Sequence, residues 1–547
     1  MKKLLAILLS CSLLTGCGAK PTETAPSTSA PETAAPTEAV EVVKEVTGDM
    51  VDILLEGQNI TVSGDAEGVY TSRDIIYYED KEVYDSGNPY GEGEEADRHT
   101  KEEANAHLVV NITAPGNYRL SGNLDLGQIR IDLGEDADKN PNAVVNLILD
   151  GVDINCEVGP AILFLNVYEC DGDASPDTAQ PDVDTTAAGA NLILAEGSEN
   201  TVSGSYVAKI LKDQEEEKKL WKQDGAIYSY MSMNVYGPGS LDLYAKNEGL
   251  DTELHLTIWS GDISIRSGND GINTNEDGVS VTTIRGGSLR ITAGLGEEGD
   301  GIDSNGYLMI RGGTVISAAN PASDAGLDSD LGSFIHGGTV IALGSAMDWA
   351  ESDSGQVTMN LQFAQMQTGD IRIFREDGTE VFSFAPAADP VLKDNIRSYQ
   401  GAILSCPSFR VGDVYTVFVD GLQMAYTGTD VMMGPGGFGN FGPGQRPENG
   451  QQRPGQTPPG ETPDGDWTRP SMPEGEMPSM PAGEMPTRPE GEMPTWPEGQ
   501  MPSMPQGEMP TRPQEPPQGF GNSGGEANTL FVMQDKVNFF SGLTLAE

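Results

Sequence analysis

The chain has 547 residues, of which 84 are acidic and 32 basic, so its net charge is −52. That charge argues against a nucleic-acid binder, which presents basic surface to phosphates. It also argues against direct binding of an acidic polymer, unless a divalent cation lies between the two anionic partners. The five cysteines and four histidines form no CxxC pair and no Cys/His cluster, so the sequence contains no zinc motif.

The first 17 residues have the form of a lipoprotein signal peptide. Lys2 and Lys3 precede an apolar run, residues 4–14, that is too short to span a bilayer. Leu14-Thr15-Gly16-Cys17 is a lipobox pattern, so Cys17 is expected to carry lipid. An ordinary cleaved signal with an incidental cysteine is the alternative. We expect a secreted, extracytoplasmic protein held at the cell membrane by its lipid anchor alone, and a monomer.

Residues 18–48 are mostly Pro, Thr, Ala, Ser and Glu, which predicts a disordered linker. Short β-branched or Leu-rich runs bounded by Gly, Asn or Asp then predict strands at 108–113, 118–121, 129–133, 144–149, 162–165 and 191–194. The charge and spacing of residues 207–221 predict one surface helix. Cys156 and Cys170 can form a disulfide outside the cell, or both can be small buried side chains.

Two interleaved repeats dominate the chain after residue 224. The first is an apolar residue, a variable residue and glycine, in which Gly261, Gly287, Gly313 and Gly338 are spaced by 26, 26 and 25 residues. The second is Asp-Gly-Ile and its variants, at residues 248–253, 270–275, 300–305 and 325–330. Repeats of this length, with several period-2 strands and glycine corners, predict coils of a right-handed parallel β-helix, an all-β fold, over residues 49–345. Leucine-rich or ankyrin repeats would need a helix in each unit, and none is evident.

The repeats end near residue 346. Residues 346–430 read as antiparallel strands, with a hairpin turn at 376–379, and predict a small β-sandwich-like module. Residues 431–527 are a low-complexity segment rich in Pro, Gly and Met with an eight-residue period, expected to be extended and without packed structure. Residues 528–547 turn apolar again and predict a terminal strand segment.

The order of these motifs resembles a family of bacterial surface carbohydrate-binding proteins. The matching runs are residues 112–122, 147–154 and 224–229, followed by the two repeat series. Founding members of that family bind cellulose and polygalacturonate, contain calcium in a β-helix, and are similar in shape to family-nine pectate lyases. The resemblance covers about residues 49–430 and implies the same fold and a polysaccharide partner.

The Asp-Gly-Ile repeat predicts a calcium site. Its fourth and sixth residues share one strand face, and we call this outward series, with the corner carboxylates before the glycines, the acidic ladder. Residues 248–330 hold 14 acidic residues, four arginines and no lysine. Like charges on neighbouring strands destabilise a sheet, and a hard cation with oxygen ligands relieves the repulsion. An acidic face without bound metal is the alternative. The candidate ligands are Asp270, Asn273, Asp300, Asp303, Asp324 and Asp328.

Strand alternation predicts a glycan-binding strip. Leu254, Leu256 and Ile258 share the inward face, so His255 and Trp259 should point outward. The equivalent outward positions of successive coils form the strip Tyr236, Trp259, Arg285, Arg311 and His336. Aromatic rings stack on sugars and guanidinium groups bind carboxylates, which suits an acidic glycan. A solvent-facing row without a ligand is the alternative.

Three functions remain compatible with the sequence. The favoured one is calcium-dependent, non-catalytic binding of an acidic, pectic or cellulosic polysaccharide at the cell surface. A polysaccharide lyase would need a Lys or Arg base beside the calcium. Lys246 is the single lysine between residues 224 and 392 and no basic cluster stands out, so no residue is assigned a catalytic role. A structural surface adhesin is the third possibility.

Overall fold

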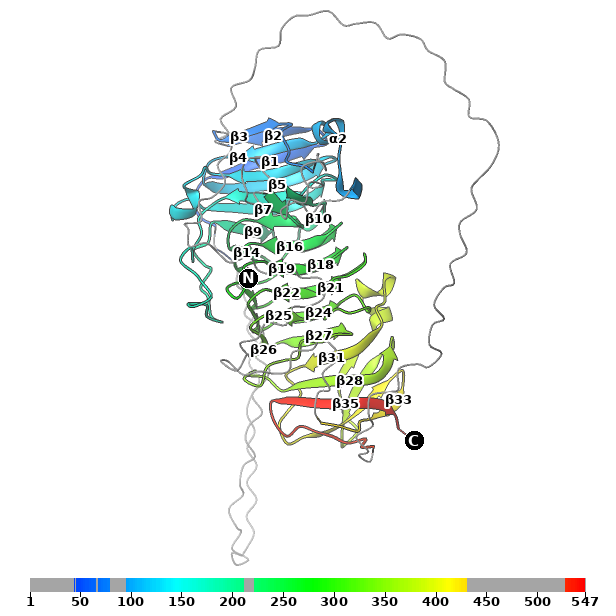
Figure 1. Ribbon diagram of the computed structural model, residues 1–547. Coiled ribbons are helices and arrows are strands. Elements are labelled where there is room, and N and C mark those ends of the chain that lie inside the picture. Colours follow the sequence, from blue (N-terminus) through cyan, green and yellow to red (C-terminus); the bar gives the residue numbers. More distant parts are fainter. Residues whose placement is uncertain are drawn as a thin grey trace, which may run out of the picture. The chain divides into compact units, whose positions relative to one another are not determined.

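The computed structural model describes residues 44, 46–64, 67–78, 95–210, 221–429 and 527–546. The predicted signal peptide with Cys17, nearly all of the 18–48 linker and all but the last residue of the 431–527 segment lie outside these residues. The described chain is an all-β protein, as predicted, in which strands of successive coils lie side by side (Figure 1).

The first elements close the N-terminal end of the stacked strands. They are β1 (Met50–Glu56), β2 (Asn59–Ser63), β3 (Val69–Ser72), η1 (Glu95–Asp97) and α2 (Lys101–Ala106). Strand β2 pairs antiparallel with β1, and β3 pairs antiparallel with β4. Helix α2 begins with a capping box in which the Glu103 backbone N–H donates to Thr100 Oγ1 at 3.2 Å and the Thr100 N–H donates to Glu103 Oε2 at 2.7 Å.

One stack of parallel strands carries the acidic ladder, and we call it the ladder stack. It consists of β4 (Leu108–Ile112), β6 (Gly127–Asp132), β8 (Ile162–Asn166), β13 (Gly225–Ser229), β16 (Glu248–Thr252), β19 (Ile272–Thr274), β22 (Ile302–Ser304) and β25 (Asp328–Ser329). Each strand pairs in parallel with the next in this order. The stack places equivalent residues of successive coils next to each other.

Two further stacks share one large sheet, because the long strands β5 (Gly116–Leu124) and β7 (Val145–Asn155) precede both of them. The strip stack is β9 (Ala190–Leu194), β14 (Met233–Tyr236), β17 (Leu256–Ile258), β20 (Val281–Ile284), β23 (Tyr307–Ile310) and β26 (Gly332–Ile335). The platform stack is β10 (Glu199–Gly204), β15 (Ser240–Ala245), β18 (Asp262–Ser267), β21 (Ser288–Thr292), β24 (Thr314–Ala318) and β27 (Thr339–Gly344). Each coil gives one strand to each stack, as β16, β17 and β18 do (Figure 1).

The interior of the coils is a continuous column of apolar side chains. Ile263, Leu289, Val315 and Val340 occupy paired positions of four successive strands and are at most 1% exposed. The repeated glycines mark corners: Gly313 has a φ of +78°, and a Cβ there would lie 2.6 Å from the Gly287 carbonyl oxygen. A larger residue cannot replace glycine at such a corner without strain. The predicted stacking of these four side chains is therefore present.

The C-terminal module covers the last coil. Its elements are β28 (Thr358–Gln367), β29 (Ile371–Arg375), β30 (Glu380–Phe384), η3 (Pro386–Ala388), η4 (Leu392–Asp394), β31 (Tyr399–Ser405), β32 (Val414–Val419), β33 (Leu422–Ala425), β34 (Phe531–Val532) and β35 (Val537–Leu545). Strand β31 pairs antiparallel with β27, and β35 returns to pair in parallel with β28 (Figure 1). The hydrophobic core of the module includes Ile341 and Leu343 of β27, so module and coils pack as one body.

The surface helix predicted for residues 207–221 is wrong at both of its ends. Val207–Ile210 is strand β11 and Trp221–Gln223 is strand β12, and the two pair antiparallel. Val207 and Gln223 are fully buried against the coils, which offer tertiary contacts that outweigh local helix propensity. Residues 211–220 lie outside the described part. A short 3-10 turn, η2, covers Ala137–Lys139.

Cys156, Cys170 and Cys406 carry free thiols, so the disulfide considered between the first two is not formed. Burial raises the pKa of the Cys156 and Cys170 thiols to about 12, which keeps both protonated. In the described part of the chain, no helix is long and apolar enough to cross a membrane.

Candidate functional site

The ladder stack brings oxygen-bearing side chains of successive coils into one row. Asp251 pairs with Asn273, Asn273 with Asp303, and Asp303 with Asp328. The intervening Ile272 and Ile302 point into the core and are fully buried. Alternation along a strand then turns the four polar side chains away from the core, as the sequence predicts.

A cluster of three carboxylates lies at the β13 and β16 end of this row, and we call it the first acidic cluster. It consists of Asp224, Glu248 and Asp251, whose carboxylate oxygens all lie within 4.8 Å of one another. Glu248 is 4% exposed and Asp251 fully buried. Sequence reasoning did not propose these residues as ligands, although Glu248 and Asp251 occupy the first and fourth positions of the repeat unit 248–253. The Asp224-Gly225 and Glu248-Gly249 dipeptides were the available signal.

Three buried oxygen atoms, two in this cluster and one on the adjacent Asn273, have no hydrogen-bond partner among the described residues. They are Glu248 Oε2, Asp251 Oδ2 and Asn273 Oδ1. The other oxygens of the two carboxylates are used: Asn273 Nδ2 donates to Glu248 Oε1 at 3.2 Å, and Asn275 Nδ2 donates to Asp251 Oδ1 at 2.6 Å. Buried oxygens without a donor are costly, by about 1–3 kcal/mol each. A bound cation is one way to satisfy them, so the donor set fits a hard metal ion.

One lysine of the β11–β12 hairpin contacts this cluster. Lys222 Nζ lies 2.7 Å from Asp224 Oδ2 and donates to Asn275 Oδ1 at 3.1 Å. Burial by itself would lower the pKa of Lys222, but the nearby Asp224, Glu248 and Asp251 outweigh it and raise the pKa well above its ordinary value. Lys222 therefore stays protonated and supplies one positive charge against three carboxyl groups.

Further along the ladder, backbone N–H groups of one coil hold the carboxylates of another. The Asp300 N–H donates to Asp270 Oδ1 at 2.6 Å, and the Ala325 N–H donates to Asp300 Oδ1 at 2.6 Å. The Gly299 N–H donates to Asp324 Oδ2 at 2.8 Å. These bonds fix the predicted ligands at the corners of adjacent coils.

The corner carboxyl groups repel one another. Burial, followed by the charges of Asp303, Asp300 and Glu248, raises the pKa of Asp270 well above its ordinary value. Burial and the charges of Asp328 and Asp303 do the same to the pKa of Asp300. Asp270 is 8% and Asn273 7% exposed, which corrects the expectation of an open, outward-facing ladder. Asp300, Asp303, Asp324 and Asp328 are half-buried, so among the predicted ligands the ladder is closed to solvent at Asp270 and Asn273 only.

The row ends at a residue that the repeats do not contain. Asp348 accepts hydrogen bonds from Ser329 Oγ at 2.9 Å and from Ser333 Oγ at 3.4 Å. Burial and the nearby Asp328 raise its pKa to about 8. Asp348 follows the last repeat in the chain, so no periodicity marked it.

The outward column of the strip stack contains the five predicted strip residues, but its aromatic half is covered. The rings of Tyr236 and Trp259 stack with centroids 5.7 Å apart and planes 9° apart, and the Arg285 guanidinium lies 4.7 Å from the Trp259 ring centroid. Tyr236 is only 3% exposed. Lys44 Nζ lies 5.3 Å from its ring centroid and donates to Asn191 Oδ1 at 2.7 Å. The predicted solvent-facing aromatic patch is therefore wrong at Tyr236, because the N-terminal segment packs over it.

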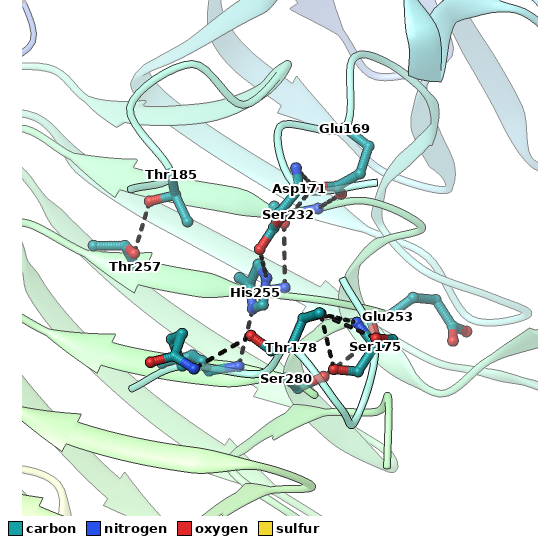
Figure 2. A network of polar contacts seen from close by, with 12 residues as sticks. Glu169, Asp171, Ser175, Thr178, Thr185, Ser232, Glu253, His255, Thr257 and Ser280 are labelled. Atoms are coloured by element: carbon teal, nitrogen blue, oxygen red, sulfur yellow. Dashed lines mark hydrogen bonds and ion pairs between the residues drawn. The ribbon is translucent and has the colours of Figure 1, made fainter. Parts of the chain in front are cut away.

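The loop between β8 and β9 covers the neighbouring outward residues (Figure 2). Thr185 Oγ1 lies 2.8 Å from Thr257 Oγ1, and His255 Nε2 lies 3.3 Å from Asp171 Oδ2. The Val281 N–H donates to His255 Nδ1 at 3.1 Å, so Nε2 carries the hydrogen that it donates to Asp171. His255 points away from the core as predicted, yet it is 1% exposed because of this loop.

A second anchor of the same loop lies beside the first (Figure 2). Glu169 accepts from the Ser232 backbone N–H at 2.7 Å and from Ser232 Oγ at 2.9 Å. The His255 N–H in turn donates to Ser232 Oγ at 3.3 Å. The loop is thus tied to both β14 and β17 at its first residues.

The basic half of the strip is partly exposed. Arg311 forms an ion pair with Asp182 of the loop, and the Gly355 N–H donates to His336 Nδ1 at 3.0 Å. Phe334 stacks beside His336 with ring centroids 6.4 Å apart, and Tyr307 lies 6.3 Å from Phe334. Sequence reasoning missed Phe334 and Tyr307, because it compared only one outward position per coil.

Comparison with known proteins finds relatives for the region that carries the ladder and the strip. Residues 106–172 and 174–378 match the model of a family described as carbohydrate-binding domain-containing protein. A curated protein of the same description, from Acetivibrio thermocellus, is 30% identical over 160 residues, which are 29% of this chain and 45% of that protein. The chain thus spans less than half the length of the curated relative it matches. A solved structure described as the polysaccharide lyase-like protein from C. thermocellum, a gadolinium derivative, is 21% identical and covers 53% of this chain and 92% of its own, with a TM-score of 0.32.

Proposed function

We propose that this protein binds polysaccharide without cleaving it, and that binding depends on calcium held by the acidic ladder. The family match over residues 106–172 and 174–378 supports polysaccharide binding in general. The observation that carries the calcium proposal is the group of buried oxygens without donors on Glu248, Asp251 and Asn273. Calcium takes six to eight oxygen ligands in flexible geometry, and the ladder offers carboxylate and amide oxygens only.

Two groups of residues would hold the ions. The first acidic cluster, with Asn273, would hold one. The residues predicted from the repeat would hold calcium further along the ladder. They are Asp270, Asn273, Asp300, Asp303, Asp324 and Asp328. When bound, calcium supplies positive charge that neutralises the ladder and can attract the carboxylate of an acidic sugar. The protein side chains position the ions and exclude water from part of each site.

The stacked parallel strands supply the rigid frame for this function. We describe the three stacks as a right-handed parallel β-helix, the hand that parallel crossover connections take in about 98% of cases. The lipobox would place this frame outside the cell, attached through Cys17. The partly exposed residues Arg285, Arg311 and His336 are the glycan contacts that we propose in the strip, and Phe334 joins them.

The lysines beside the ladder disfavour a lyase. A lyase base must accept a proton, whereas Lys222 Nζ lies 2.7 Å from Asp224 Oδ2 and donates to Asn275 Oδ1 at 3.1 Å. Lys246 Nζ donates to the Glu157 carbonyl oxygen at 3.1 Å. Neither lysine is set up as a general base, which supports binding without cleavage.

Affinity electrophoresis tests the proposal, in gels that contain polygalacturonate or a soluble cellulose derivative. Retardation should require calcium, should vanish in EDTA, and should return with calcium. Incubation with polygalacturonate and calcium should give no rise in absorbance at 235 nm. Retardation that is equal in EDTA and calcium would contradict calcium dependence, and an enzyme-dependent rise at 235 nm would establish a lyase instead.

A further inference from the structure

The outward face of the platform stack holds an exposed aromatic ring beside a guanidinium group. Strands β15, β18 and β21 pair in parallel, with Leu243 opposite Ile265 and Ile265 opposite Ile291 on the core side. The outward neighbours are Tyr244 and Arg266. Tyr244 is 42% exposed, unlike the buried Tyr236 of the strip.

The ring of Tyr244 is covered by its column neighbours on one side. Its neighbour in the next coil is Arg266, whose guanidinium carbon lies 5.1 Å from the ring centroid. Its neighbour in the preceding coil is Ser203, whose short side chain cannot cover a tyrosine ring. The ring therefore offers one face toward β10, and the Arg266 guanidinium lies over its other face.

Two further arginines belong to the platform stack and to the C-terminal module. Arg290 forms ion pairs with Asp262 at 3.3 Å and with Asp389 of the C-terminal module at 3.2 Å. Arg397 of the same module donates from Nη2 to the carbonyl oxygen of Ala293 at 2.9 Å. Arg290 and Arg397 thus lie where the module joins the platform stack, on a protein whose net charge is −52.

Existing partners of Arg266 leave room for a ligand. Its ion pair with Asp242 is 3.7 Å long, and the Asp242 side chain is 53% exposed. The Arg266 side chain itself is 16% exposed, and its buried Nη1 donates no hydrogen bond to a described residue, so a ligand carboxylate that displaces Asp242 would meet an unused donor. A pyranose ring stacks on tyrosine, and a carboxylate on that sugar binds a guanidinium group through two hydrogen bonds.

We propose that Tyr244 and Arg266 form a second glycan-contact site, separate from the strip, that prefers a carboxylated sugar ring over a neutral one. The site rests on the proposed polysaccharide-binding function and extends it to another face of the coils. Tyr244 stacks on the sugar, and Arg266 binds its carboxylate. A chain of uronic acid residues is the ligand class that satisfies both groups.

Calorimetric titration of the full chain in calcium tests the site, with an oligogalacturonide as the charged probe and a cello-oligosaccharide as the neutral probe. Tyr244→Ala should weaken binding of both probes by about three- to tenfold, since an aromatic contact contributes about 0.5–1.5 kcal/mol. Arg266→Ala should weaken the oligogalacturonide by a similar factor and leave the neutral probe unchanged. Tyr244→Phe should bind like the wild type.

Matched controls separate the site from general effects. Tyr70→Ala removes a tyrosine that is 51% exposed on β3. Arg372→Ala removes a guanidinium that lies 5.1 Å from the Phe374 ring in the C-terminal module. Both should bind as the wild type does. If the wild type binds and the affinities of Tyr244→Ala and Arg266→Ala both lie within twofold of the wild-type affinity, the second site alone is overturned. If the wild type binds neither probe, the proposed function is overturned together with the site.

Discussion

At the scale of single residues, the acidic ladder is a conflict between burial and charge. Asp270 is 8% exposed, yet its carboxylate lies among Asp300, Asp303 and Glu248, which raise its pKa. Removal of one such charge relieves repulsion when no cation is bound. The same removal takes away a ligand when calcium is present. A single substitution should therefore change stability in opposite directions under the two conditions.

Asp270→Asn tests this reversal. We expect its melting temperature to exceed that of the wild type in EDTA and to fall below it in calcium, by about 1 °C in each case for about 1 kcal/mol. Asp394→Asn, at an exposed position of η4, is the matched control and should change neither value. Thermal unfolding followed by circular dichroism gives both numbers. A variant that is less stable than the wild type under both conditions would contradict the charge conflict.

His107 gives the fold a pH dependence of its own, at a position separate from the ladder. Its Nδ1 lies 2.8 Å from the Glu103 carbonyl oxygen, and the Glu157 N–H donates to its Nε2 at 3.1 Å. Burial lowers its pKa below the ordinary value of 6.5. The folded state therefore resists protonation of His107. This contribution to stability is complete above pH 6.5 and is lost as the pH falls through the lower, folded-state pKa.

His107→Gln should flatten that dependence. We expect lower stability than the wild type at pH 7.5, because both hydrogen bonds of the ring are disturbed, and a smaller loss on going to pH 5.5. Urea unfolding at the two pH values, in buffers of equal calcium concentration, measures the difference. An identical loss in variant and wild type would show that His107 does not carry this part of the pH dependence.

Sequence alternation predicted which residues point away from the core but not which of them are covered. Tyr236, Trp259 and His255 all lie on the predicted outward side. Tyr236 is nonetheless covered by Lys44, and His255 by the β8–β9 loop. Alternation reports the direction of a side chain relative to its own strand only. Cover by a segment far away in the chain leaves no periodic signal.

At the scale of elements, the β8–β9 loop is held by a small number of polar contacts (Figure 2). His255 donates to Asp171, which keeps the pKa of that carboxyl below its usual value. Thr185 bonds both Asn234 and Thr257 at the other end of the loop. The loop is thus pinned at two points over the strip.

Asp171→Ala should remove the contact between this loop and His255. We expect faster amide hydrogen exchange across residues 171–189 with little change in the melting temperature, because the coil core is untouched. Asp173→Ala, an exposed neighbour, should exchange like the wild type. Exchange followed by mass spectrometry checks both variants. Unaltered exchange in Asp171→Ala would mean that other contacts hold the loop.

Elements with a repeat or with a clear strand pattern were predictable, and the charged segment without either was not. Glycine corners and Asp-Gly-Ile units located β16, β18, β19, β21, β22 and β24 because each coil repeats the same local chemistry. Residues 207–223 occur once, and a charged segment that is short can form either a helix or a hairpin. Burial of Val207 and Gln223 favours the hairpin, because the surface that covers them exists only in the folded protein. The site followed the same rule: Asp270 and Asp300 were found by period, and Asp348 was not.

At the scale of the whole molecule, the attachment to the membrane stays a prediction from the sequence. The lipobox Leu14-Thr15-Gly16-Cys17 lies outside the described residues. Cys17→Ala should move most of the protein from the membrane fraction into the medium, because the thiol is the lipid acceptor. Cys11→Ala, within the apolar run of the signal, should leave it in the membrane. Equal retention of Cys17→Ala and wild type in the membrane fraction would refute the lipobox.

The central claim is that calcium neutralises the acidic ladder of the folded protein, and thermal unfolding with and without the ion tests it most directly. A ligand that binds only the folded state stabilises it by about 2.7 kcal/mol at a hundred times its dissociation constant. For a chain of this length the account predicts a melting temperature that falls by about 3 °C or more in EDTA. It also predicts that calcium restores that temperature and that potassium at equal ionic strength does not. A melting temperature that is the same in EDTA, in calcium and in potassium would contradict the account.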